Sequence, residues 1–429
     1  MYLMGRFKYM DSVQFRGLAK WDGVSFSKMA DTSICYCDNY NCCKSAWNMN
    51  RVGDKFIFGP LDPWHVFFPS SQMVELKDSA WSPVNGNFLY NNGSEGTPLN
   101  WFQIGNELFV VGSFEMVDSI PAVSIASFNG QKWKGYGMTK EWSNNIPTVW
   151  SIMMYKGKLI AGGNFIIGPM NDFFTDIAYY EDGKWLPLGG GIKGGLSWVN
   201  GMVVYKGELY VYGRFYQTEG NVGNCVMRWD GDKWKDVGGG VCPWDGGQIW
   251  EMKVIDDKLY AVGIFDCVSD GLDASKVASW DGEKWCKVGN SYFNNSINSI
   301  DSFKGELFVA GGFTKINGEP LPYFVKFIGN LADSPCGSVA IETPVNQQTI
   351  LQITPNPADE AARIPLPKAI KAVTIWVYNT LGQLVYQKQH QDLPEPAVVL
   401  QVGEWGSGVY FVEVSPGDGR VWAGRFMKK

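Results

Sequence analysis

A short motif recurs along most of the chain and limits its possible folds more than any other feature. The clear copies read NELFVVGSF, GKLIAGGNF, GELYVYGRF, DKLYAVGIF and GELFVAGGF, while MYLMGRF is a shortened copy and DKFIFGPL a degenerate one. The equivalent glycines are Gly5, Gly59, Gly112, Gly163, Gly213, Gly263 and Gly311. A period of about fifty residues indicates an array of similar supersecondary units, each packed on its neighbours.

A second motif follows the same period. It reads FNGQKW, YEDGKW, WDGDKW and WDGEKW, with WDGVSF as a variant. Asn-Gly or Asp-Gly between apolar runs is a strong hairpin signal, because glycine accepts the positive φ that the turn demands. Each unit therefore has four predicted strands and no helical periodicity, which is typical of a β-propeller blade.

The glycines after the second strand and the tryptophan of the fourth strand resemble those of kelch and galactose-oxidase-like repeats. The resemblance covers residues 1–330 and implies an all-β propeller of six or seven blades. A galactose-oxidase copper site needs two histidines and two tyrosines close together, whereas the chain has only His65 and His390, and His390 lies beyond the repeats. The resemblance therefore stops at the fold, and we predict no metal or other cofactor.

The C-terminal residues form a different pattern. The segments IWVYNTLGQLVYQ and WGSGVYFVEV alternate with strand periodicity, which predicts a small immunoglobulin-like β-sandwich over residues 349–429, after a linker at 331–348. Together with ITPNPADE and the basic end GRFMKK, these segments resemble the type A C-terminal sorting domain of type IX secretion cargo in Bacteroidetes. The residues that carry the resemblance are Pro355, Asn356, Pro357, Gly382, Gly408, Tyr410, Lys428 and Lys429.

The sorting resemblance implies a partner and a location. It implies recognition by the type IX secretion machinery, passage across the outer membrane, and a protein that is secreted or held on the cell surface. In this family the tag is usually removed on export. The alternative is an ordinary immunoglobulin-like module without a sorting role.

The first and last repeats are incomplete in the sequence. The first lacks its first strand, and the last stops near residue 330 without its tryptophan strand. Residues 1–20 contain no apolar run of signal-peptide length, although cargo of this system must first cross the inner membrane. We therefore expect an N-terminally truncated sequence, with the missing strands before Met1; the alternative is a six-bladed ring with additional fragments.

Composition fits an extracellular all-β protein. Aromatic residues make up 15% and charged residues 19%, which provides apolar material for a large core. The net charge of −6 argues against a nucleic-acid partner, which would require a basic face. No apolar stretch is long enough to predict a transmembrane segment.

Nine cysteines fit an oxidising compartment. The cluster CYCDNYNCC contains Cys35, Cys37, Cys42 and Cys43, which could hold zinc, although disulfides are favoured in a secreted protein. Cys225, Cys242, Cys267 and Cys286 fall in neighbouring repeats and could join their loops. With Cys336 in the linker the total is odd, so at least one thiol has no partner within the chain, and the connectivity stays open.

Catalytic signals are weak. His65, in the aromatic segment DPWHVFF, is better explained by packing than by acid–base chemistry, and no acidic residue recurs in a motif with an assignable catalytic role. The glycine-rich segments GGGIKGG and GGGVCPWDGG lack the Lys-Ser/Thr ending of a phosphate loop and are interpreted as connectors between blades. These observations favour binding over catalysis.

One recurrence suggests where binding occurs. Tryptophan or asparagine lies nine residues before the leucine position of the second strand, at Trp47, Trp150, Asn200, Trp250 and Asn298. This position falls near the start of the innermost strand, at the mouth of the central channel, where such side chains could stack on sugars and bind their hydroxyls. The alternative is packing between blades. The sequence thus predicts a non-catalytic binding or adhesion module for a glycan or a protein; the alternative is a secreted carbohydrate-active hydrolase or lyase with carboxylates at the channel mouth.

Overall fold

The computed structural model describes the chain except residues 5–8, 11–12, 15–17, 24, 30–47, 60–72, 79, 85, 139–145, 169–173, 243–245, 270, 290, 321–322, 329–339, 343–349, 367–371, 380–383, 392–396 and 416–421. It divides into two compact units, Met1–Glu342 and Thr343–Lys429. The candidate zinc cysteines 35–43, His65 and Cys336 lie outside the described residues.

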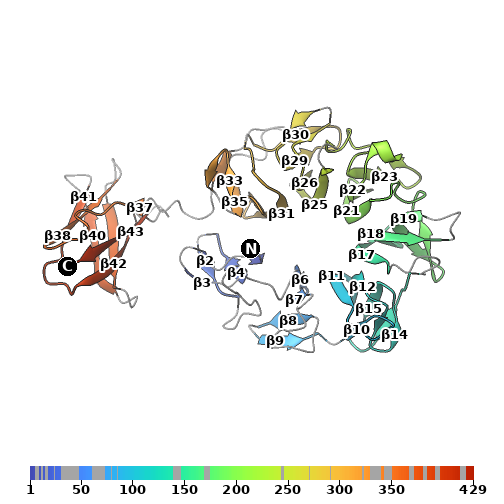
Figure 1. The fold of residues 1–429 in the computed structure, drawn as a ribbon, viewed down its shortest axis with the longest axis horizontal. Helices are drawn as coiled ribbons and strands as arrows, with labels where there is room; N and C mark the ends of the chain where they lie inside the picture. The colour runs from blue at the N-terminus through green and yellow to red at the C-terminus, as the bar shows by residue number, and fades with distance from the viewer. Residues whose placement is uncertain are drawn as a thin grey trace. The chain divides into compact units, whose positions relative to one another are not determined.

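The first unit is a ring of antiparallel sheets around a central opening (Figure 1). Within the described residues there are seven such blades, and all but the first have four strands. Blade 1 comprises β1 (Tyr2–Met4), β4 (Leu18–Trp21) and β5 (Phe26–Ser27); blade 2 comprises β6 (Asn48–Val52), β7 (Lys55–Gly59), β8 (Val74–Lys77) and β9 (Ala80–Pro83). Blade 3 comprises β11 (Thr97–Ile104), β12 (Glu107–Ser113), β15 (Ile125–Phe128) and β16 (Trp133–Gly135); blade 4 comprises β17 (Thr148–Tyr155), β18 (Lys158–Ile167), β19 (Phe174–Glu181) and β20 (Lys184–Pro187).

The remaining blades repeat the same order. Blade 5 comprises β21 (Trp198–Tyr205), β22 (Glu208–Arg214), β23 (Val226–Trp229) and β24 (Trp234–Lys235); blade 6 comprises β25 (Gln248–Ile255), β26 (Lys258–Ile264), β29 (Val277–Trp280) and β30 (Trp285–Lys287). Blade 7 comprises β31 (Ile297–Phe303), β32 (Glu306–Gly311), β35 (Phe324–Ile328) and β36 (Ala340–Glu342). The predicted propeller is confirmed, and of the two predicted blade numbers the described residues form seven.

Short strands and one helical turn lie in the loops that connect the blade strands. They are the pairs β2 (Tyr9–Met10) with β3 (Val13–Gln14), β27 (Cys267–Val268) with β28 (Leu272–Asp273), and β33 (Lys315–Ile316) with β34 (Glu319–Pro320); the small sheet of β10 (Phe88–Leu89), β13 (Met116–Val117) and β14 (Ile120–Pro121); and the 3-10 helix η1 (Gln217–Glu219). In the part of the chain that the structure describes, no helix is long and apolar enough to cross a membrane.

The glycines of the first motif are explained by close backbone packing. Gly163 pairs with Val149, Gly213 with Val199 and Gly263 with Ile249 on the innermost strand of the same blade. A Cβ on any of these glycines would lie well inside van der Waals contact with a backbone carbonyl oxygen of that strand. The same holds for Gly112 and Gly311, so the repeat conserves a position that has no room for a side chain.

The hairpin-motif tryptophan of the fourth strand joins each of blades 4–6 to the blade before it. The indole Nε1 of Trp285 donates to the carbonyl oxygen of Val237 at 2.7 Å, and Trp234 donates to Leu188 at 3.3 Å. Trp185 makes the equivalent bond to Tyr136 at 2.6 Å. The periodic tryptophan is thus a structural link between blades.

The ring closes between blade 7 and blade 1. Lys206 donates its Nζ to the carbonyl oxygen of Asp281 in the following blade, and its side chain lies against Gly282. Lys304 of blade 7 lies in the same way against Gly23 of blade 1. Because one contact recurs at both junctions, blade 1 follows blade 7 as blade 6 follows blade 5.

The two incomplete repeats have different outcomes. Among the described residues, blade 1 lacks the innermost strand that would pair with β1, as the sequence predicts. The expectation that the last repeat lacks a fourth strand was wrong, because β36 pairs with β35. β36 comes from the stretch predicted as linker and carries no tryptophan, and strand pairing requires only backbone hydrogen bonds.

The second unit is a small β-sandwich. One sheet has the order β37 (Ile350–Leu351), β43 (Trp422–Lys428), β42 (Gly408–Ser415), β39 (Ala372–Tyr378) and β40 (Leu384–Gln391); the other pairs β38 (Ala361–Pro365) with β41 (Ala397–Gln401). Alternate residues of β39, Val373, Ile375 and Val377, are buried in its core. This is the strand periodicity on which the prediction rested.

Candidate functional site

The predicted binding residues share one backbone position. The innermost strand of each of blades 3–7 contains a β-bulge near its start, and the unpaired residues are Leu99, Trp150, Asn200, Trp250 and Asn298. A bulge residue falls outside the ladder and its side chain is redirected. The recurrence seen in the sequence therefore marks a repeated bulge. Trp47 lies outside the described residues.

Side-chain amides at or beside the bulges donate hydrogen bonds to backbone carbonyl groups of the next blade. The Nδ2 of Asn200 donates to the carbonyl oxygen of Ile249 at 2.8 Å, which joins blades 5 and 6. In the same way Asn100 donates to the carbonyl oxygen of Trp150 at 3.0 Å. The Asn200 amide thus has a role between blades, as the packing alternative expected. Asn298 is exposed, and its Oδ1 accepts a hydrogen bond from Ser296.

Aromatic residues gather where the innermost strands of blades 4–6 begin, which we call the strand-start face. Trp150 contacts Trp198 edge-to-face, with ring centroids 6.1 Å apart. The guanidinium of Arg214, the cross-strand partner of Trp198, lies 4.9 Å from the Trp198 ring and 5.8 Å from the Tyr216 ring. We call these four residues the aromatic patch. Trp250, on blade 6, is 37% exposed.

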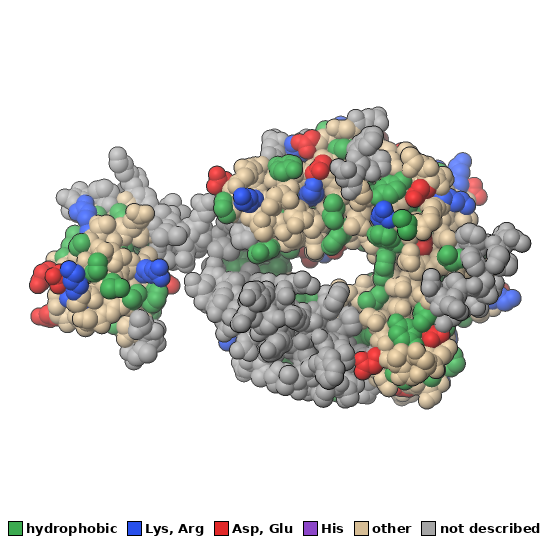
Figure 2. All heavy atoms as spheres, viewed as in Figure 1, with side chains coloured by type: hydrophobic (Ala, Val, Ile, Leu, Met, Phe, Trp, Pro, Cys, Tyr) green, Lys and Arg blue, Asp and Glu red, His purple; other side chains and the backbone are tan. Residues whose placement is uncertain are grey.

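Hydrogen bonds fix the side chains of the aromatic patch. Arg214 donates from Nη1 to the carbonyl oxygen of Leu196 at 2.8 Å, and the Tyr216 hydroxyl donates to the carbonyl oxygen of Gly247 at 2.9 Å. Leu196 itself is 69% exposed beside them. Figure 2 shows hydrophobic side chains bordering the central opening on the side where Figure 1 places β17. Sequence reasoning missed Trp198, Arg214 and Tyr216, because Trp198 and Tyr216 have no counterpart of the same type at the repeat period and Arg214 has only Arg6.

Two carboxylates near the strand-start face have raised pKa values. Asp176 is fully buried; its carboxylate accepts hydrogen bonds from the Phe165 N–H at 3.0 Å and the Ser197 hydroxyl at 2.6 Å, and burial raises its pKa to about 7. Burial also raises the pKa of Glu251, which accepts the Ile300 N–H at 2.9 Å. Asp176 joins blades 4 and 5, and Glu251 joins blades 6 and 7.

Asp176 should make stability depend on pH. Its pKa rises on folding from the ordinary 3.8 to about 7, so between these values the folded state holds a proton that the unfolded chain has released. The stability this proton provides is present at low pH and is lost as the pH rises to about 7, with a slope of roughly 1 kcal/mol per pH unit. Asp176→Asn, whose amide tolerates the positive φ of 67° at this position, should remove that slope.

Denaturant unfolding of wild type and Asp176→Asn at several pH values tests this. Asp182→Asn is the control, because Asp182 also has a positive φ but is exposed. Equal slopes for wild type and Asp176→Asn would contradict the expectation.

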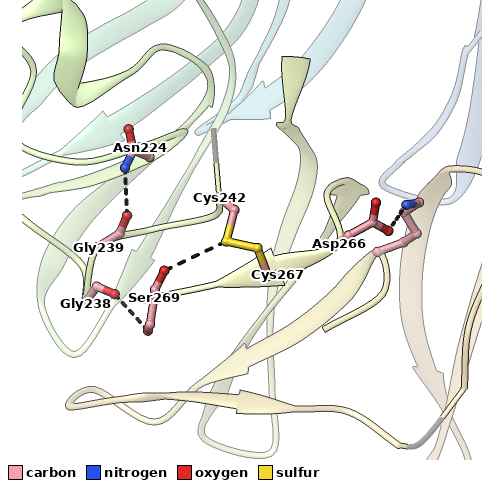
Figure 3. The surroundings of a disulfide bond; sticks show 8 residues. Asn224, Gly238, Gly239, Cys242, Asp266, Cys267 and Ser269 are labelled. Carbon is pink, nitrogen blue, oxygen red and sulfur yellow. Dashed lines mark hydrogen bonds and ion pairs between the residues drawn. A yellow bond between two sulfur atoms is a disulfide. The ribbon is translucent and has the colours of Figure 1, made fainter. Parts of the chain in front are cut away.

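The cysteines stabilise the loops between blades. Cys242 and Cys267 form a disulfide beside the glycine-rich connector, where Asn224 donates to the Gly239 carbonyl at 3.1 Å (Figure 3). Cys286 is also disulfide-bonded. Cys225 is a free, buried thiol, and burial raises its pKa to about 12, which makes it a poor nucleophile. No group of three or more potential metal ligands occurs among the described residues.

In the second unit, residues from the two ends of the sorting pattern meet. The Asn356 side chain accepts the Met427 N–H at 2.9 Å and donates to the Arg425 carbonyl at 3.5 Å. The Ala358 N–H donates to the Met427 carbonyl at 2.7 Å, and the Lys429 N–H donates to the Ala358 carbonyl at 3.0 Å. The segment containing Pro355, Asn356 and Pro357 thus runs beside β43, and we call this contact the terminal clasp.

The other sorting residues support the same sheet. Gly408 begins β42, and Tyr410 on that strand is buried against Phe426, with its hydroxyl donating to the Gly406 carbonyl at 2.8 Å. Lys428 is almost fully buried, with its Nζ at 2.7 Å from the Lys429 carbonyl oxygen. Gly382 lies outside the described residues.

The architecture places the chain among seven-bladed β-propeller proteins that carry a C-terminal β-sandwich. Residues 352–429 match the secretion system C-terminal sorting domain family, so the sandwich is a sorting domain and indicates a secreted or cell-surface protein. The chain aligns with a solved structure titled "Structure of YjhT" at 12% identity and a TM-score of 0.37, over 70% of this chain and 97% of that chain. At that distance the seven sheets themselves, and not the likeness, define the propeller. No curated protein matches the chain.

Proposed function

We propose that this protein is a non-catalytic propeller that binds a glycan at its strand-start face, outside the cell or on its surface, after export by the type IX secretion machinery through residues 352–429. The observation that carries the proposal is the set of half-buried and exposed aromatic rings at the starts of neighbouring innermost strands. Trp150 packs on Trp198, and Trp250 exposes more than a third of its surface one blade further on.

Aromatic plates of this kind suit a saccharide. The apolar face of a sugar ring stacks on an indole, while its hydroxyls need polar partners at the edge of the plate. The exposed Asn298 amide, at the equivalent bulge of blade 7, offers such a partner. Because hydrogen bonds within the propeller already order the Tyr216 and Arg214 side chains, binding would cost little side-chain entropy.

A hydrolase or lyase would need carboxylates free to act on a substrate. The two carboxylates with raised pKa values, Asp176 and Glu251, each accept a backbone N–H and each join two blades. Their surroundings account for them as structural groups, and this supports binding over catalysis. A protein ligand on the same face remains the competing binding hypothesis, which the experiment below separates.

Trp250→Ala should abolish or strongly weaken saccharide binding while leaving the fold intact, because substitutions of exposed residues usually change stability by less than about 0.5 kcal/mol. Trp285→Ala is the contrasting packing variant and should cost roughly 3–5 kcal/mol, because that indole is buried and hydrogen-bonded to Val237. Trp150→Ala, at a half-buried ring, should weaken binding with a smaller loss of stability than Trp285→Ala.

The measurement is a glycan array and a polysaccharide-depletion assay on the whole chain, with thermal melting of each variant. Val254→Ala is a matched control, since Val254 is exposed on the same strand as Trp250. Retention of no saccharide by the wild type would overturn the proposal, and so would unchanged retention by Trp250→Ala. Saccharide-independent capture of a protein partner would favour the adhesion alternative.

A further inference from the structure

We propose that the aromatic patch selects an acidic saccharide, one that carries uronic acid carboxylates, and that Arg214 binds the carboxylate. This inference rests on the proposed glycan-binding function and names the class of its ligand. The juxtaposition that carries it is a guanidinium held against the rings of Trp198 and Tyr216, with Trp150 packed edge-to-face on Trp198.

Arg214 has no acidic partner among the residues that the structure describes, although it lies in a propeller with net negative charge. The contrast is Arg228 in the same blade, whose Nη1 lies 2.6 Å from the Glu208 carboxylate. The nearby Glu219 accepts the N–H of Tyr216 at 3.2 Å, and its carboxyl group lies against Gly194. Arg214 is therefore a cation ordered by aromatic rings and a carbonyl group, which leaves its charge available to an anion.

The donor capacity of Arg214 points the same way. A guanidinium has five N–H donors in a planar fork that matches a carboxylate bidentately. The Leu196 carbonyl takes up only part of these donors.

Stacking and charge together define the ligand class. The indoles offer apolar plates to pyranose faces, and Arg214 offers a fork to the carboxylate at the ring edge. A neutral sugar would cover Arg214 without replacing the water that solvates it, and leaving a desolvated charge unpaired is unfavourable. The same patch should therefore discriminate against neutral saccharides of equal size.

The test is calorimetric titration of the whole chain with an oligogalacturonate, with the same oligosaccharide after reduction of its carboxyl groups, and with a sulfated neutral oligosaccharide. We expect the uronate to bind at least about tenfold more tightly than its reduced form, since a charge-assisted bidentate pair is lost on reduction. Arg214→Gln should remove that preference. Arg214→Lys should restore little of it, because lysine keeps the charge but not the fork.

Arg51→Gln is the control, since Arg51 is an exposed arginine on β6 that donates to Gly53. It removes the same charge and should leave the preference unchanged. Thermal melting of Arg214→Gln close to that of wild type would exclude unfolding as the cause of lost binding.

Three results would overturn the inference: equal affinity for the uronate and its reduced form, an unchanged preference in Arg214→Gln, or equal binding of the sulfated oligosaccharide, which would indicate attraction by charge alone. In each of these cases, Trp250-dependent binding of a neutral saccharide would leave the proposed glycan-binding function standing. Absence of any saccharide binding, by contrast, would remove both.

Discussion

A chain shortened to end at Glu342 is expected to remain in the periplasm of a host that carries the type IX secretion system, whereas the full chain reaches the medium or the cell surface. The boundary between the two compact units falls after this residue, so the deletion removes the sorting domain without cutting a propeller strand. The propeller blades contact their own neighbours and should fold without the sandwich. Immunoblots of periplasmic, surface and medium fractions measure the effect.

A point variant tests the terminal clasp within the intact domain. Asn356→Ala removes the side chain that accepts the Met427 N–H and donates to the Arg425 carbonyl, so the segment beside β43 loses two of its links to the C-terminal strand. We expect export to fall, with the sandwich still folded around Ile375 and Val412. Gln401→Ala, an exposed change on β41, is the control. Undiminished export of both the deletion and Asn356→Ala would refute a sorting role for these contacts.

For the terminal clasp, the sequence predicted which residues matter but not that they contact one another. The resemblance linked Asn356 and the basic end by their order in the chain, but their contact spans a separation of 69 residues and depends on how β43 closes the sheet. Pairing at that distance leaves no periodic trace in a single sequence. The sandwich itself was predictable, because alternation along β39 is local.

In the propeller, residues that recur at the repeat period could be predicted from the sequence, whereas residues particular to one blade could not. The repeat glycines recur because blades 3–7 need the same close approach, and the hairpin tryptophans of blades 4–6 make the same inter-blade bond, so a single sequence displays both patterns. The bulge position was also detectable, but the role of its side chain was not. Asn200 reaches the next blade, Trp150 packs on Trp198, and Trp250 is exposed, although all three occupy one backbone position.

Residues that serve one blade alone gave no signal. Arg214 and Tyr216 follow the second-strand glycine of blade 5; among the other repeats only the first has an arginine at the position of Arg214, and none has a tyrosine at the position of Tyr216. Asp176, within β19, occupies a positive-φ position that in other blades directly precedes the third strand and holds Ser124, Cys225 and Lys276. The backbone conformation is shared, whereas the side chain and its burial are particular to each blade. Function in a repeat protein is expected where the repeats differ.

The second-strand glycines should be the least tolerant positions of the propeller. In Gly263→Ala the new methyl group would meet the carbonyl oxygen of Gln248 on the innermost strand, and this oxygen belongs to the backbone, so no rotamer change can relieve the overlap. β25 and β26 would have to separate at the start of the bulge, beside the position of Trp250. We expect a loss of about 3 kcal/mol or more in the free energy of unfolding, at the upper end of overpacking effects.

Gly195→Ala is the matched control, because Gly195 is exposed, has an ordinary φ, and a Cβ there meets nothing within 4 Å. Its stability should stay within about 0.5 kcal/mol of wild type. Urea unfolding followed by tryptophan fluorescence measures both variants, and the amplitude reports whether the buried Trp280 and Trp285 of blade 6 lose their packing. Equal stability of Gly263→Ala and Gly195→Ala would mean that the strands separate at no cost, and the glycine period would then need another explanation. A large loss confined to Gly263→Ala ties the repeat that defines the propeller to one steric constraint, met once in each of blades 3–7.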